Sequence, residues 1–114
     1  MSKNMPPPVL GEFEQIVMLA LLRLGPEAYG AVVCGEIEKR GGRGVSVSAV
    51  HTTLDRLEQK GLVKSRVGDP TPQRGGKRKR HYEVAAYGMK ALQASYRSLR
   101  NMADGLEHLL GEPA

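Results

Sequence analysis

Apolar residues change their spacing at Gly61, and this change constrains the fold more than any other feature of the sequence. Over residues 46–60 they recur every three or four positions, as on one face of a helix. Residues 62–67 are of alternating character, which is typical of a strand, and residues 80–84 predict a second, antiparallel strand. Between them, residues 68–76 contain two prolines and three glycines and predict a loop. The pattern predicts a helix followed by a long antiparallel β-hairpin.

Two further helices are predicted before this unit. The first covers residues 10–24, ends at the glycine–proline pair 25–26, and is apolar over most of its circumference. Such a helix needs more cover than a small domain offers, so we expect part of it to meet a partner. The second covers residues 27–40 and ends at a glycine pair. Ser46 is the expected N-cap of the third helix, because its hydroxyl can accept a hydrogen bond from an unpaired backbone N–H.

The final predicted helix covers residues 86–110 and carries one continuous apolar seam. Its members are spaced alternately three and four residues apart, which is the heptad pattern of helices that pack on other helices. A partner explains such a seam on a terminal helix better than the helix's own domain does. Together with the first helix it predicts a homodimer through Leu10, Phe13, Val17, Met89, Leu92, Tyr96, Leu99, Ala103, Leu106 and Leu110.

The order of these elements predicts a mainly α fold with a β-hairpin wing. Helices joined by a short glycine-containing turn and followed by a hairpin form a winged helix-turn-helix. We therefore expect a disordered lead-in over residues 1–9, a winged helix-turn-helix DNA-binding domain over 10–85, and a C-terminal dimerisation helix and tail over 86–114. In this geometry the third helix enters the major groove of DNA.

The outward face of the third helix and the hairpin loop supply the candidate DNA contacts. Opposite its apolar stripe, the third helix presents hydroxyl and amide side chains that can bond base edges or phosphates. Four consecutive basic residues, 77–80, can lie along the DNA backbone or enter the minor groove. Such a run is usually a solvated loop, but its position on a wing favours DNA contact. The predicted DNA-binding residues are Ser46, Ser48, His51, Thr52, Arg56, Lys64, Arg74, Lys77, Arg78 and Lys79.

Composition agrees with a nucleic-acid partner without defining the fold. The 114 residues include 17 basic and 12 acidic side chains, and the net charge of +5 suits a polyanion. Cys34 is the single cysteine, so no intramolecular disulfide can form, which argues for a reducing cytoplasm. The longest apolar run, Ile16–Leu22, is far too short to span a bilayer. We expect a cytoplasmic protein with no membrane partner.

No catalytic residue, cofactor or metal ligand is predicted. The three histidines, His51, His81 and His108, have no metal-ligand spacing with Cys34 or with one another. The glycine pair at 75–76 lies inside the hairpin, so it does not form a phosphate-binding loop, and no nucleophile elbow occurs. A winged helix that senses metal or redox state through Cys34 would lack partner ligands.

Several short motifs together carry a family resemblance. They are Leu10-Gly11, Gly25 with Tyr29-Gly30, Ser46, Leu54, Arg56-Leu57-Glu58, Gly61-Leu62-Val63, Gly75-Gly76, Arg80 to Tyr82, and Gly88. With these motifs the chain resembles the PadR family of bacterial transcriptional regulators over residues 10–110, and specifically its short subgroup with a single C-terminal helix. The resemblance implies a dimeric winged-helix repressor that dimerises through its first and last helices. It also implies that a small-molecule effector can sit between the subunits.

Two departures from the family pattern are visible. His51 stands where many relatives place a tyrosine. The chain has no tryptophan, whereas some relatives stack planar drugs on an aromatic residue of the last helix, so multidrug binding is not predicted.

The leading hypothesis is a dimeric, sequence-specific DNA-binding regulator that represses an adjacent operon, with ligand response left open. The alternative, from another class, is a winged-helix adaptor or interaction module that binds nucleic acid only nonspecifically. The ratio of affinities for operator and random duplex separates the two. The operator, the effector, the regulated genes and the choice between repression and activation stay open at this point.

Overall fold

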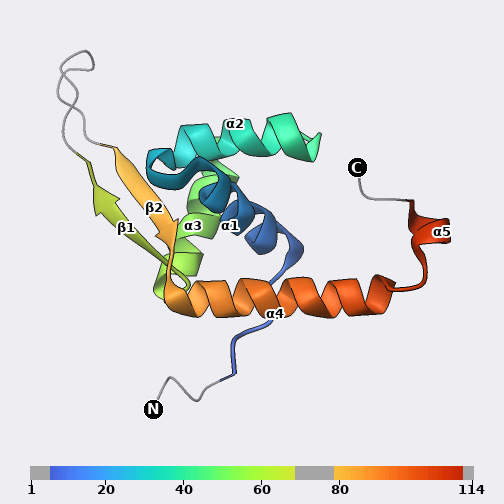
Figure 1. Ribbon diagram of the computed structural model, residues 1–114. Coiled ribbons are helices and arrows are strands. Elements are labelled where there is room, and N and C mark those ends of the chain that lie inside the picture. The colour runs from blue at the N-terminus through green and yellow to red at the C-terminus, as the bar shows by residue number, and fades with distance from the viewer. Residues whose placement is uncertain (1–5, 69–78, 112–114) are drawn as a thin grey trace.

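The computed structural model describes residues 6–68 and 79–111. In chain order its elements are α1 (Glu12–Leu24), the 3-10 turn η2 (Gly25–Glu27), α2 (Gly30–Gly41), α3 (Val47–Gln59), β1 (Val63–Val67), β2 (Arg80–Val84), α4 (Ala86–Ala103) and α5 (Glu107–Leu110). Figure 1 shows α1, α2 and α3 gathered between the hairpin and the long helix α4. The predicted fold class, mainly helical with a β-hairpin and a long C-terminal helix, is confirmed.

The core lies where the three helices meet the base of the hairpin. Met18 of α1, Val33 of α2 and Leu54 of α3 are fully buried, as is Leu62 just before β1. The two strands pair antiparallel, with a register that runs from Val63 opposite Val84 to Val67 opposite Arg80. The hairpin therefore starts from the core and extends away from it, as Figure 1 shows.

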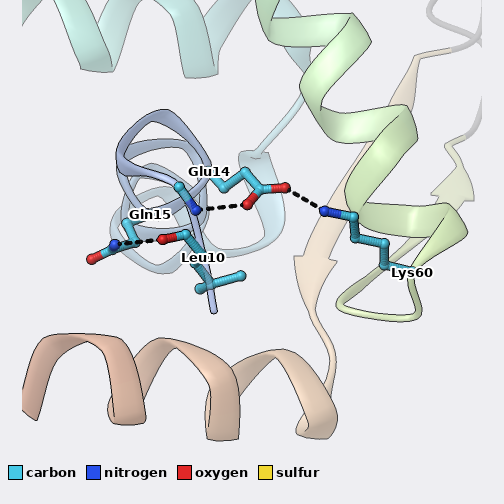
Figure 2. A network of polar contacts seen from close by, with 5 residues as sticks. Leu10, Glu14, Gln15 and Lys60 are labelled. Carbon is cyan, nitrogen blue, oxygen red and sulfur yellow. Dashed lines mark hydrogen bonds and ion pairs between the residues drawn. The ribbon is translucent and has the colours of Figure 1, made fainter. Parts of the chain in front are cut away.

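A polar contact ties the start of α1 to the end of α3 (Figure 2). The Glu14 carboxylate accepts a hydrogen bond from the Gly11 backbone N–H, with Oε1 2.8 Å from the nitrogen. Its other oxygen, Oε2, lies 2.9 Å from the Lys60 Nζ at the C-cap of α3. Burial alone would raise the pKa of Glu14, but the Gly11 hydrogen bond and the Lys60 ammonium together hold it below its ordinary value. The ionised carboxylate thus joins two helices that are distant in sequence.

The third helix begins and ends where its sequence signals predict. The Ser46 Oγ accepts a hydrogen bond from the Ala49 backbone N–H at 3.0 Å, so Ser46 is the N-cap. Gly61 follows the helix with φ of +78°, a left-handed conformation that favours glycine.

The start of the second helix differs from the prediction. Residues 25–27 form the 3-10 turn η2, and α2 begins only at Gly30. The residue between them, Tyr29, has extended backbone angles and pairs with His81 of β2 in an isolated antiparallel bridge. A contact with a distant strand therefore delays the helix by one turn.

The predicted terminal helix over residues 86–110 is wrong in its second part. The helix α4 ends at Ala103, because Asp104 has extended backbone angles and Gly105 has φ of +85°. The chain then forms the short helix α5, with Leu106 as its N-cap. The predicted apolar seam is consequently divided between two helices that do not share an axis (Figure 1).

The glycine in the first turn of α4 fixes how that helix sits on the core. A β-carbon at Gly88 would overlap the backbone carbonyl of Leu62, and it would also approach Val84. The same Leu62 oxygen accepts a hydrogen bond from the Ala85 N–H at 3.0 Å. Only a residue without a side chain allows this close approach.

Residues 6–10 precede α1 without regular secondary structure. Pro7 and Pro8 are half-buried, and residues 7–10 line a groove with the middle of α4. Leu10 is buried in the core. Residues 1–5 of the predicted lead-in lie outside the described residues.

Candidate nucleic-acid interface

The helix α3 divides into a buried and an exposed face. Val50, Leu54 and Leu57 are fully buried, which confirms the predicted inward stripe. The opposite face is exposed and polar, and it consists of Ser48, Thr52, Asp55 and Gln59. Ser46 is exposed too, but its hydroxyl is used for the helix cap. The core therefore fixes which side of α3 is presented to a partner.

Asp55 is a residue of this exposed face that the sequence analysis did not include among the DNA contacts. Asp55 is exposed, and its carboxylate would repel a nearby phosphate. A carboxylate can accept a hydrogen bond from the exocyclic amine of cytosine, so it is suited to reading a base. The periodicity of α3 was a sufficient signal to find it.

His51 lies where α3 approaches the first turn of α2. A β-carbon at Gly30 would overlap the imidazole of His51, at Nε2 and Cε1. The residue as a whole is still exposed. His51 therefore has a packing role at the junction of the two helices in addition to the DNA contact predicted for it.

Polar contacts connect α3 to the hairpin. The Ser65 hydroxyl donates to the Glu58 Oε2 at 2.6 Å, and Arg80 Nη1 donates to the Ser65 Oγ at 2.9 Å. Lys64, a predicted DNA contact, lies opposite Glu83 across the strands with its Nζ 3.6 Å from Oε2. Both side chains of this pair are exposed, so the pair contributes at most about 1 kcal/mol and leaves Lys64 able to exchange partners.

The basic residues of the hairpin are only partly within the described chain. Arg74, Lys77 and Arg78 lie outside the described residues. Lys79 is described, and its side chain lies against Tyr29. Its Nζ lies 3.2 Å from the Tyr29 Oη and 4.3 Å from the centroid of the Tyr29 ring. Arg56, by contrast, is exposed and close enough to Glu14 to lower the pKa of that carboxyl further.

The residues predicted for dimerisation fall into two groups. Leu10, Val17 and Leu92 are buried in the protomer's own core, so they cannot offer a surface to a second copy, and we remove them from the interface. Phe13, Met89 and Ala103 are half-buried. The remaining predicted residues are exposed, namely Tyr96, Leu99, Leu106 and Leu110. The heptad count missed Met102 and Leu109, which are also exposed apolar residues on α4 and α5.

Cys34 is buried in α2, and its thiol donates to the Val45 backbone oxygen at 3.2 Å. Burial, with a smaller effect of Glu38, raises the pKa of the Cys34 thiol, which favours the unreactive neutral form.

Among the described residues, no three side chains of the His, Cys, Asp or Glu types gather to hold a metal ion. Within the same part of the chain, no helix has both the length and the apolar character to cross a membrane.

Three helices, an antiparallel hairpin and a polar exposed face on the third helix define a winged helix-turn-helix protein. The model of the PadR-like family of transcriptional regulators matches residues 18–94, and the chain belongs to this family. Family membership implies DNA-binding regulation of transcription. It confirms the resemblance drawn from the motifs and the expectation of a regulator rather than an enzyme.

Solved structures of PadR-like regulators have the same fold. A PadR-like transcription factor from Bacteroides fragilis is 20% identical, with a TM-score of 0.68 over 85% of this chain and 88% of that one. A PadR-like regulator from Bacillus cereus is 18% identical, with a TM-score of 0.69 over 89% and 93%. A PadR family regulator from Eggerthella lenta is 25% identical, with a TM-score of 0.66 over 90% and 88%. Comparison with curated proteins gave no significant match.

Proposed function

We propose that the protein is a homodimeric, sequence-specific DNA-binding repressor that acts on an adjacent operon in the cytoplasm. The exposed polar face of α3 carries this proposal. The buried stripe of Val50, Leu54 and Leu57 holds that face outward, and the N-cap at Ser46 fixes where the helix begins. The N-terminal half of a recognition helix usually lies deepest in the major groove, so Ser48, His51 and Thr52 are the residues we propose for base contact.

A second copy of the chain is the partner that we propose for the exposed apolar surface of α4 and α5. Leu99 and Met102 are 66% and 76% exposed, and Leu109 and Leu110 are 72% and 67% exposed. Isolated exposed leucines are ordinary, but a run of them along one end of a molecule marks an interaction surface. Figure 1 shows this end of α4 extending beyond the three-helix core.

Two-fold symmetry would suit the proposed DNA binding. One α3 contacts only a short half-site, whereas two copies related by a two-fold axis read a near-palindrome with half-sites about 34 Å apart. We propose that such a dimer represses transcription by occupying a promoter. We also propose that ligand response, as the resemblance implies, uses the surface between the subunits. The apolar groove of α4 with residues 7–10 supports an apolar effector there.

Selection of bound duplexes from a random pool, followed by a specificity measurement, tests the proposal. The affinity for the selected duplex is compared with that for a scrambled duplex at one salt concentration. Thr52→Ala should reduce the discrimination by about 1–3 kcal/mol for a lost base contact, while the fold survives because Thr52 is exposed. Gln93→Ala, an exposed polar residue of α4, is the matched control and should leave the ratio unchanged.

Two outcomes would contradict the proposal. Equal affinity of the wild type for selected and scrambled duplexes would favour a nonspecific interaction module instead. If Thr52→Ala and His51→Ala both keep the full wild-type ratio, the proposed face of α3 does not read the bases.

A further inference from the structure

The strand β2 is joined to the start of α2 by backbone contacts of its middle residues. The Tyr82 N–H donates to the Ala28 oxygen at 2.9 Å, and Tyr29 pairs with His81 in the isolated bridge. On the other side of the hairpin, the Gly68 N–H donates to the Lys79 oxygen at 2.8 Å. The two described ends of the hairpin loop, Gly68 and Lys79, are therefore held together beside His81, the residue that pairs with Tyr29.

Side chains close the same junction. The Lys79 ammonium lies over the Tyr29 ring, 4.3 Å from its centroid, and donates to the Tyr29 hydroxyl at 3.2 Å. The His81 imidazole meets that ring edge-on, with centroids 5.5 Å apart and an interplanar angle of 81°. It also fills the space beside Gly68, where a β-carbon would come within 2.8 Å of its Cε1.

The packing, rather than hydrogen bonding, holds His81 in this place. Its Nδ1 is buried and has no hydrogen-bond partner within the described part of the chain. An unpaired buried polar atom is unfavourable, so the ring's contacts with Tyr29 and Gly68 must outweigh it. The hairpin residues thus hold the Tyr29 ring with a cation on its face and an aromatic edge at its side.

We propose that Tyr29, Lys79 and His81 form a lock that fixes the direction of the hairpin relative to α2 and α3. In this proposal Lys79 is a positioning residue for DNA binding and not a phosphate contact, which differs from the role predicted for it. This inference rests on the proposed function, because the direction of the wing matters only if the hairpin and α3 meet the same duplex. The lock itself is a property of the free protein and can be observed without DNA.

The first experiment observes the lock directly in the full-length protein. The ε-methylene protons of Lys79, assigned by NMR, should be shifted upfield by the ring current of Tyr29. The shift should disappear in Tyr29→Leu and persist in Tyr29→Phe, which keeps the ring. Lys90, an exposed lysine of α4, should resonate at the position of an unstructured lysine in all three proteins. Unshifted Lys79 protons in the wild type would overturn the lock.

The second experiment separates positioning from phosphate contact through salt dependence. Lys79→Met keeps the aliphatic stem and should weaken binding to the selected duplex about three- to tenfold, because the cation over the ring is lost. The slope of log affinity against log salt should stay at the wild-type value. Lys79→Arg should restore affinity, since a guanidinium also stacks on tyrosine.

A phosphate contact gives a different result. The slope would then fall by about 0.9 for the single lost contact, and Tyr29→Leu, which removes the ring, would leave affinity unchanged. That result with Lys79→Met would overturn the positioning role. Equal affinity of the wild type for selected and scrambled duplexes would instead contradict the proposed function, and the NMR result would still stand for or against the lock. Lys90→Met is the control for loss of one positive charge.

Discussion

Glu14 shows how one carboxylate can hold two helices together. It is buried at the start of α1, and its two oxygens face the Gly11 N–H and the Lys60 ammonium, as Figure 2 shows. Because the ion pair joins α1 to the C-cap of α3, it stabilises the arrangement of two core helices rather than one helix end alone.

We predict that Glu14→Gln lowers the free energy of unfolding by about 1–2 kcal/mol at pH 7, since the amide keeps one acceptor but loses the charge opposite Lys60. The folded-state pKa of Glu14 is lowered, so its stabilisation is present above the ordinary value of 4.5 and is lost as the pH falls through the folded-state value. Urea unfolding at pH 7 and pH 3 measures both effects. Glu12→Gln, at an exposed position of the same helix start, should cost less than about 0.5 kcal/mol. An equal loss at both pH values would argue against the ion pair.

Gly88 gives a second prediction at the level of one residue. A methyl group at this position would meet the Leu62 carbonyl, which cannot move away because it belongs to the backbone. We expect Gly88→Ala to destabilise the protein by about 1–3 kcal/mol or to displace α4. Gly35→Ala is the matched control: Gly35 is an exposed helical glycine with no atom near its β position, and alanine there should stabilise by about 0.5–1 kcal/mol. Thermal unfolding measures both variants, and their melting temperatures should shift in opposite directions. Shifts in the same direction would contradict the proposed role of Gly88.

At the scale of elements, the sequence predicted those boundaries that local signals mark. Ser46 and Gly61 identify both ends of α3, and β2 begins and ends as predicted. The start of α2 could not be predicted, because Tyr29 is held extended by its pairing with a distant strand. The end of α4 was missed for a different reason. The leucine spacing continues past Gly105, so periodicity alone does not reveal that α4 ends at Ala103. The backbone angles of Asp104 and Gly105 show this end.

The candidate interfaces were predictable to different degrees. The buried stripe of α3 fixes its exposed face, so periodicity located the polar residues of that face. A heptad position, however, does not say whether its side chain packs within one chain or between two. Leu92 and Leu99 are one heptad apart in the same predicted seam, yet the first is buried in the protomer and the second is exposed. The contact of Lys79 with Tyr29 was likewise not predictable, because the two residues are 50 positions apart in sequence.

The difference in burial between Leu92 and Leu99 gives a prediction for α4. Leu99→Glu or Met102→Glu should separate the proposed dimer and leave the protomer folded, because both side chains are exposed within one chain. Leu92→Glu should unfold the protein, since an unpaired charge would be buried at a cost of several kcal/mol. Sedimentation measures the association and circular dichroism measures the fold. Wild-type protein that sediments as a monomer at micromolar concentration would contradict the proposed dimer.

At the scale of the whole molecule, we propose that positive charge and the recognition surface have separate roles. We predict that replacing Lys77 and Arg78 by alanine weakens binding to all duplexes alike. The slope of log affinity against log salt concentration should fall by roughly one unit for each lost phosphate contact. The ratio between selected and scrambled duplexes should stay unchanged, in contrast to Thr52→Ala. Affinities measured at several salt concentrations test this separation. An unchanged slope would mean that these two residues do not touch phosphate.

The close approach of Gly88 to the Leu62 carbonyl has a consequence for operator architecture. Because backbone meets backbone there, the angle between α4 and the three-helix core is set by a junction that side-chain substitutions elsewhere cannot easily adjust. In a two-fold dimer through α4, this fixed angle determines how far each core lies from the symmetry axis. It therefore sets the distance between the two α3 helices. Related chains with the same junction should therefore measure the same half-site separation, even when the bases that they read are different.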